Sequence, residues 1–187
     1  MELLGRSTAD GEIPSMIQRE HNEHMTTKRL NVERVSYIST KPFREVLELL
    51  SAGVGHPNMD QLWQDLFKAS TVSDVDEIMH SAAGSSALIE FLRFNHGDIV
   101  HKGSAGSAPG NVRLVVGNPS IMRRMVEHVP DAGSYAPVTI LIDERPDGVH
   151  LSYDRMASFL QSYGNEQALK VARELDVKVE ALLASVG

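Results

Sequence analysis

Residues 138–154 read VTILIDERPDGVHLSYD, and this stretch decides the fold class. Two apolar-rich runs, 138–143 and 149–153, flank the turn sequence Arg145-Pro146-Asp147-Gly148. Proline presets the backbone angle that a turn needs, and glycine tolerates the positive φ of a tight reversal. The stretch therefore predicts an antiparallel β-hairpin late in the chain.

The remaining elements are predicted from apolar periodicity. Apolar runs with strand character predict strands at 32–39, 87–94 and 112–116, and stripes of period 3.6 predict helices over 43–50, from 58, from 73, over 121–129 and over 165–186. Ser73 with Asp76 resembles a capping box at the start of the third helix. The strand at 87–94 is apolar on both faces, so we expect it to be central in the sheet. Together these elements predict an α+β fold, with helices packed on one face of a mostly antiparallel sheet.

The first 30 residues differ from the rest of the chain. Gly5, Gly11 and Pro14 interrupt a polar stretch without sustained periodicity, so we expect residues 1–30 to be a flexible tail and residues 31–187 to form a single α+β domain. No signal-peptide pattern and no 18-residue apolar run are found in this sequence. We therefore expect a cytoplasmic protein that does not bind membranes.

Composition excludes several classes of function. The chain has 187 residues, with 18 Lys and Arg against 25 Asp and Glu, a net charge of -7, eight His and no Cys. The absence of Cys excludes disulfides, Cys-ligated metals and thiol catalysis. The acidic balance argues against nucleic-acid binding. The dinucleotide, phosphate-loop and nucleophile-elbow motifs are absent as well, so the sequence favours a non-enzymatic protein with no cofactor.

The polar residues after the strand at 87–94 are the first candidate site. His96 and His101 bracket Gly97-Asp98-Ile99-Val100. Histidine titrates near neutral pH, so His96, Asp98 and His101 could act as acid, base or ligand. The alternative is a structural role, in which the histidines bond to the backbone of the loop.

Two further candidates come from later strands. Asn118 lies in Gly117-Asn118-Pro119 between a strand and a helix, where it can cap the helix or help bind an anion at the helix start. Tyr153, on the last strand of the hairpin, could join the histidines across the sheet. We predict no metal site at any other group of residues.

Several segments resemble the domain of unknown function 302 family: VRLVVGNP at 112–119, VPDAGSYAPVTILIDERPDGVHLSY at 129–153, STKPFREVLELL at 39–50 and FNHGDIVHK at 94–102. Ala136-Pro137 stands at the family's step into the hairpin, and Asn95 replaces an acidic residue beside His96. The segment 57–84 and the long last helix lie outside the pattern. The resemblance implies a helix-grip or TATA-binding-protein-like fold, association into dimers and a small ligand between sheet and helix. It implies no established activity.

The leading hypothesis is a cytoplasmic, non-enzymatic homodimer that binds a small ligand or partner in a cleft between sheet and helices, beside the glycine-rich segment 103–110. The candidate ligand-binding residues are His96, Asp98, His101, Asn118 and Tyr153.

Two alternatives remain. One is a metal-dependent or acid–base enzyme that uses the region of His96, Asp98 and His101. The other is a scaffold protein in which an apolar stripe forms an interface rather than core; its residues are Met59, Trp63, Phe67 and Met79.

Overall fold

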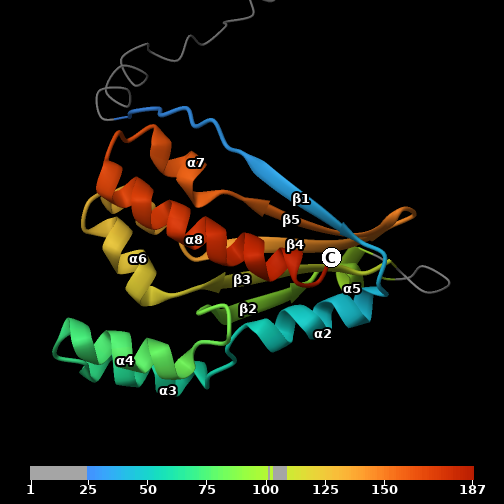
Figure 1. Ribbon diagram of the computed structural model, residues 1–187, viewed down its shortest axis with the longest axis horizontal. Helices are drawn as coiled ribbons and strands as arrows, with labels where there is room; N and C mark the ends of the chain where they lie inside the picture. The colour runs from blue at the N-terminus through green and yellow to red at the C-terminus, as the bar shows by residue number, and fades with distance from the viewer. Residues whose placement is uncertain (1–24, 101, 103–108) are drawn as a thin grey trace, which may run out of the picture.

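The computed structural model describes residues 25–100, 102 and 109–187. In this part of the chain, five strands, seven α-helices and one 3-10 helix form the expected α+β fold (Figure 1). The strands are β1 Arg34–Ser39, β2 Ile89–Asn95, β3 Asn111–Gly117, β4 Val138–Arg145 and β5 Gly148–Asp154. The helices are α2 Phe43–Gly53, α3 Met59–Lys68, α4 Val72–Ala82, α5 Gly97–Val100, α6 Pro119–Val126, η1 Pro130–Ser134, α7 Met156–Gln161 and α8 Glu166–Ala184.

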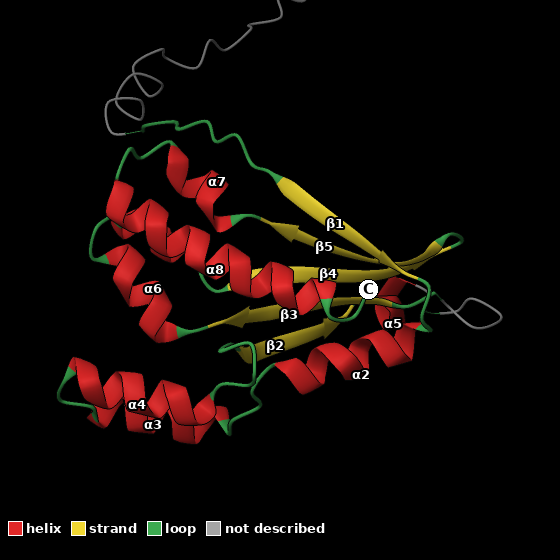
Figure 2. Cartoon of the chain, viewed as in Figure 1, coloured by secondary structure: helices red, strands yellow, loops and turns green. Residues whose placement is uncertain are grey.

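The strands form one antiparallel sheet in the order β1-β5-β4-β3-β2. The predicted hairpin is confirmed: β4 pairs with β5, and Arg145 lies opposite Gly148 at the turn. Gly148 has φ +138°, a conformation that other residues rarely adopt. Figure 2 shows α8 in front of this single sheet, with α6 and α7 beside one end of it.

The expectation that the strand at 87–94 is central was wrong. β2 is an edge strand, bonded to β3 on one side. Its apolar side chains Ile89, Leu92 and Phe94 lie on one face, opposite Gly117, Val115 and Arg113, whereas the polar Glu90, Arg93 and Asn95 lie on the face of the main core. Ile89 packs with α3 and α4, and Leu92 and Phe94 are 49% and 41% exposed. The register shifts between Glu90 and Leu92, so Phe91 is the extra residue of a β-bulge.

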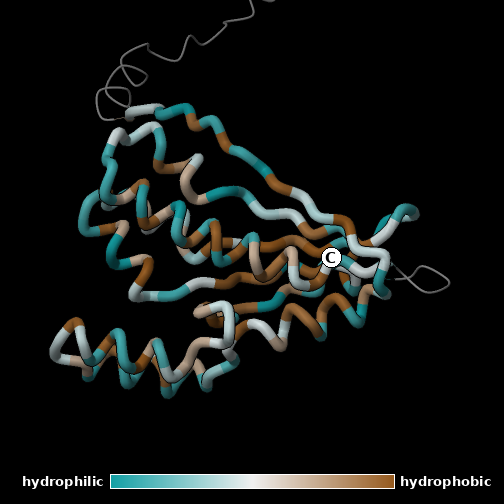
Figure 3. The backbone as a smooth tube through the Cα atoms, in the orientation of Figure 1, coloured by the Kyte–Doolittle hydropathy of each residue, from teal (hydrophilic) through white to brown (hydrophobic). Residues whose placement is uncertain are grey.

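One face of the sheet forms the main core. Alternate residues of β3, β4 and β5 point to this face and are buried: Val112, Leu114, Val116, Val138, Ile140, Ile142, Val149, Leu151 and Tyr153. Apolar side chains of α2, α6 and α8 belong to the same cluster. The hydrophobic colour of the central strands and its alternation along α8 are visible in Figure 3.

A buried carboxylate connects α8 to the end of the sheet. Asp176 accepts hydrogen bonds from the Tyr153 hydroxyl at 2.6 Å and from the backbone N–H groups of Met156 at 2.7 Å and Ala157 at 3.0 Å. Asp176 thereby satisfies donors at the start of α7, which has no N-cap side chain of its own. Burial raises the pKa of the Asp176 carboxyl and also that of the Tyr153 hydroxyl, so the phenol keeps its proton and donates.

The helix starts predicted at 58 and 165 are confirmed to within one residue: α3 begins at Met59 and α8 at Glu166. The side chains of Asn58 and Asn165 cap these two helices. The predicted box of Ser73 with Asp76 was wrong by two residues. Thr71 accepts a bond from the Asp74 N–H, and the Asp74 carboxylate accepts one from the Thr71 N–H, so α4 begins earlier.

Helices α3 and α4 form a hairpin outside the main core, beside α6 (Figure 1). Leu62 and Met79 pack with Ile89 in a separate small cluster. The apolar stripe of α3 is therefore only partly core: Trp63 is 51% exposed and Phe67 is 93% exposed.

The α3–α4 hairpin is connected to the rest of the protein where the backbone at Val54–Gly55 lies against the backbone at Gly84. Gly55 donates to the Leu88 carbonyl and accepts from the Glu90 N–H, and the Gly84 N–H also donates to Leu88. A Cβ at Gly84 would overlap the backbone of Val54 and Gly55. This crossing needs glycine because no side chain fits between the backbones.

Residues 1–24 of the predicted tail lie outside the described residues. Lys28, which belongs to the same predicted tail, places its Nζ 3.3 Å from the centroid of the Tyr163 ring. Within the described part of the chain, no helix combines the length and hydropathy needed to cross a bilayer.

Replacing Gly84 with alanine should lower the free energy of unfolding by more than about 2 kcal/mol, because the new Cβ separates the crossing backbones. Urea denaturation measures the change. Gly133→Ala is the matched control, since its Cβ would have no heavy atom nearer than 3.7 Å, and it should stay within about 1 kcal/mol of the wild type. Equal stability of the two variants would contradict the tight crossing.

Asp176→Asn should destabilise the protein by roughly 1–3 kcal/mol, because an amide cannot accept hydrogen bonds at both of its terminal atoms. A double-mutant cycle with Tyr153→Phe, measured by thermal and urea unfolding, gives the coupling energy of the Tyr153–Asp176 hydrogen bond. The double variant should lose less stability than the sum of the single variants. Strict additivity would show that the two side chains are not coupled.

Candidate functional site

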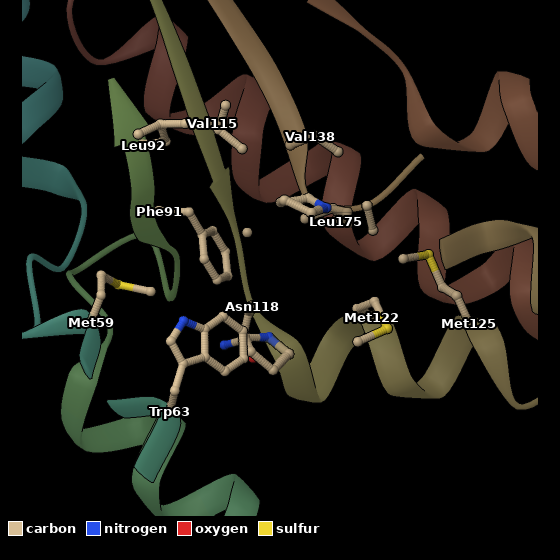
Figure 4. A pocket seen from close by; sticks show the side chains of 14 residues that line it. Met59, Trp63, Phe91, Leu92, Val115, Asn118, Met122, Met125, Val138 and Leu175 are labelled. Atoms are coloured by element: carbon tan, nitrogen blue, oxygen red, sulfur yellow. The ribbon is translucent and has the colours of Figure 1, made fainter. Parts of the chain in front are cut away.

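The main candidate site is a cavity of about 430 Å³ between α3, the ends of β2 and β3, and α6, which we call the α3–α6 pocket (Figure 4). No charged side chain lines it. The lining residues come from α3, β2, β3, α6, the start of β4 and α8: Met59, Trp63, Phe91, Leu92, Val115, Gly117, Asn118, Pro119, Met122, Met125, Ala136, Pro137, Val138 and Leu175.

Two aromatic rings form one side of the pocket. The Trp63 and Phe91 ring centroids are 6.1 Å apart, with 29° between the ring planes. The Asn58 cap fixes the start of α3, and Trp63 follows one turn later. Phe91 occupies the bulge of β2, and a bulge redirects a side chain from the regular alternation of a strand. A helix start and a strand irregularity thus bring the two rings together.

Methionines and prolines form much of the opposite side. Met122 and Met125 point from α6, and Leu175 comes from α8 (Figure 4). The turns at both ends of this wall contain proline. Pro119 is the first residue of α6, and Pro137 follows a cis peptide bond before β4.

The structure places Asn118 at the pocket and in a capping role. Its Oδ1 accepts from the Ser120 N–H at 2.9 Å, and its Nδ2 donates to the Ala87 carbonyl at 2.9 Å. Asn118 therefore holds α6 to the segment before β2 while it lines the pocket. The capping interpretation of Gly117-Asn118-Pro119 is confirmed.

The other candidates lie elsewhere. Asn95 pairs with Val112 and Ile89 with Gly117, so His96 follows the end of β2 that is far from Asn118. The His96 ring stacks on Phe94, with centroids 6.0 Å apart. Asp98 accepts from the Asn95 amide at 2.7 Å. His101 lies outside the described residues.

Tyr153 belongs to the core, where its hydroxyl bonds to Asp176. The candidates of known position therefore fall into three separate places: the α5 end of β2, the pocket and the core. Across residues 25–100, 102 and 109–187, no group of three or more His, Asp and Glu side chains could hold a metal ion.

The pocket was not predicted from the sequence, because Met59 and Trp63 were assigned to a core or interface stripe and Phe91 to a regular central strand. One signal was present in the sequence. A regular edge strand alternates apolar and polar residues, but β2 carries two adjacent apolar residues, Phe91 and Leu92, between Ile89 and Phe94.

The comparisons with known proteins identify the family. The model of the family described as domain of unknown function DUF302 matches residues 67–186, which is more than half of the chain. The chain belongs to the DUF302 family. The match includes the whole of α8 and residues 67–84, so the expectation that the last helix lies outside the DUF302 pattern was wrong, and the same expectation for the segment 57–84 was wrong from residue 67 onward.

The DUF302 fold is also found in a solved structure. The crystal structure of an uncharacterized conserved DUF302 protein from Bacillus stearothermophilus matches 82% of this chain and 98% of its own, with a TM-score of 0.57 and 11% identity. At this identity the likeness concerns the fold. No curated protein matches the chain.

Phe91→Ala should shift the tryptophan emission to longer wavelength and increase its quenching by acrylamide, because Trp63 loses the ring against which it stacks. Trp63 is the only tryptophan of the sequence, so the signal is unambiguous. Phe94→Ala removes the same ring from the same strand at a position that stacks on His96, and it should leave the emission unchanged. A similar shift in both variants would contradict the assigned stacking.

Proposed function

We propose that the protein binds a small, mainly apolar molecule in the α3–α6 pocket. The observation that carries the proposal is the combination of a cavity of about 430 Å³ with a lining that contains no charged side chain. Small-molecule sites usually have volumes of roughly 300–1,000 Å³ and are lined mainly by apolar and aromatic residues.

The chemistry of the lining supports this role. A ligand that displaces water from Trp63, Phe91 and the facing methionines removes apolar surface from water on both partners. Met59 and Met122 have flexible side chains that can adapt to the shape of a ligand. Trp63 remains half exposed at the pocket, so burying more of its ring would add to the affinity.

We assign the predicted ligand cleft to this pocket, which is lined by Asn118 and not by His96. The enzyme hypothesis based on His96, Asp98 and His101 receives no comparable support, since the carboxylate of Asp98 bonds to Asn95 and the His96 ring stacks on Phe94. The homodimer stays a separate prediction, and ligand binding in this pocket does not require it.

Binding can be measured with prodan, an uncharged naphthalene dye whose emission moves to shorter wavelength in apolar surroundings. We expect a saturable shift and energy transfer from Trp63 when prodan occupies the pocket. Met122→Glu should weaken binding about tenfold or more, because it places a carboxylate against the ligand.

Val177→Glu is the control, since it adds the same charge on the exposed side of α8 and should bind like the wild type. Circular dichroism confirms that both variants are folded. The proposal would be abandoned if wild-type protein caused no saturable shift, or if Met122→Glu and wild type bound prodan equally well.

A further inference from the structure

We infer that the ligand of the α3–α6 pocket is an uncharged aromatic molecule, and that the pocket selects against carboxylates such as fatty acids and aromatic acids. This inference rests on the proposed function and defines the chemical class of the ligand. It follows from two properties of the lining: it holds no cationic side chain and its one amide, Asn118, is already bonded, and its aromatic rings lie together.

Asn118 and two backbone N–H groups at the α6 side of the pocket are engaged within the protein. Both ends of the Asn118 amide have partners, in Ser120 and Ala87. The Ala136 N–H donates to Ala132, and the Met122 N–H donates to the Asn118 carbonyl. The prolines of this wall have no N–H to offer. A carboxylate inside the pocket would therefore lose its water without gaining a cationic partner in exchange.

The nearest cations of α6 are also paired. Arg123 and Arg124 adjoin Met122 and Met125 in sequence, yet neither arginine lines the pocket. Arg123 forms an ion pair with Glu127 at 2.8 Å, and Arg124 forms one with Glu174 at 2.9 Å. An incoming anion would have to compete with these carboxylates for the guanidinium groups. On α3, the charged neighbour of Met59 is Asp60, which repels anions.

The aromatic preference comes from Trp63, Phe91 and the methionines. The two rings are inclined by only 29°, so they present adjacent π faces and edges to a flat ligand. Aromatic pairs attract each other beyond the effect of area burial, and thioether sulfur contacts rings favourably. Met59 and Met122 line the same cavity and can contact a ring held there. An aliphatic chain of equal hydrophobicity would gain less from these contacts.

Three probes separate these properties by isothermal titration calorimetry on the full chain at pH 7. The probes are 2-acetylnaphthalene, the similarly shaped anion 2-naphthoate, and octan-2-one, an aliphatic ketone. We expect 2-acetylnaphthalene to bind most tightly. Binding of 2-naphthoate should be weaker by about tenfold or more, and that of octan-2-one by roughly threefold to tenfold. The variant Met122→Glu should weaken 2-acetylnaphthalene, and Val177→Glu should not.

The outcomes distinguish the ligand class from the proposed function. If 2-naphthoate or octan-2-one binds as tightly as 2-acetylnaphthalene, and Met122→Glu weakens that binding, the uncharged aromatic class is overturned while the pocket remains a binding site. If none of the three binds, or if Met122→Glu leaves binding unchanged, the proposed function is overturned as well. An affinity order led by 2-acetylnaphthalene and sensitive to Met122→Glu supports the inference.

Discussion

Nine buried side chains of β3, β4 and β5 point to one face of the sheet, and α8 packs against them in the same core. Burial of this one face is the principal source of stability, because apolar area removed from water drives folding. It also restricts space. Helices α2, α6 and α8 occupy the face, so α3 and α4 have to pack beyond the end of β2 with a small cluster of their own.

The α3–α6 pocket lies where these two clusters meet. Met59 and Trp63 belong to the α3–α4 hairpin, whereas Val138, Met125 and Leu175 belong to the main body. Two separately packed surfaces seldom fit without a gap, since each is arranged around its own core. Phe91, at the bulge, reaches across from the sheet to the hairpin through its contact with Trp63.

The features that were predicted correctly depend on residues close together in sequence. The β4–β5 turn, the cap at Asn118 and the helix starts near residues 58 and 165 are local hydrogen-bonding or backbone effects. The capping box of α4 was predicted at Ser73 and found at Thr71, because the pairs Thr71–Asp74 and Ser73–Asp76 have the same spacing and overlap in this segment. Local patterns settle which residues can cap a helix, and packing decides between neighbouring choices.

The features that were missed depend on distant partners. The edge position of β2 is set by pairing with β3, and a bulge leaves no periodic signal that a sequence can separate from a regular strand. For the same reason Asn118 was identified as a candidate whereas Trp63 and Phe91 were not. The three adjacent residues Gly117-Asn118-Pro119 indicate the capping role of Asn118. The Trp63–Phe91 ring pair, in contrast, depends on the contact between α3 and β2, which are distant in sequence.

The glycine crossing has a further consequence for how this protein can diversify. The chain leaves the body at Gly55 and returns at Gly84, and both residues bond to Leu88, so the entry and exit of the α3–α4 hairpin are neighbours. Residues of α3 and α4 take part in no pairing of the five-stranded sheet. Substitutions in α3 can therefore alter the wall that Met59 and Trp63 contribute to the α3–α6 pocket while every strand pairing is kept.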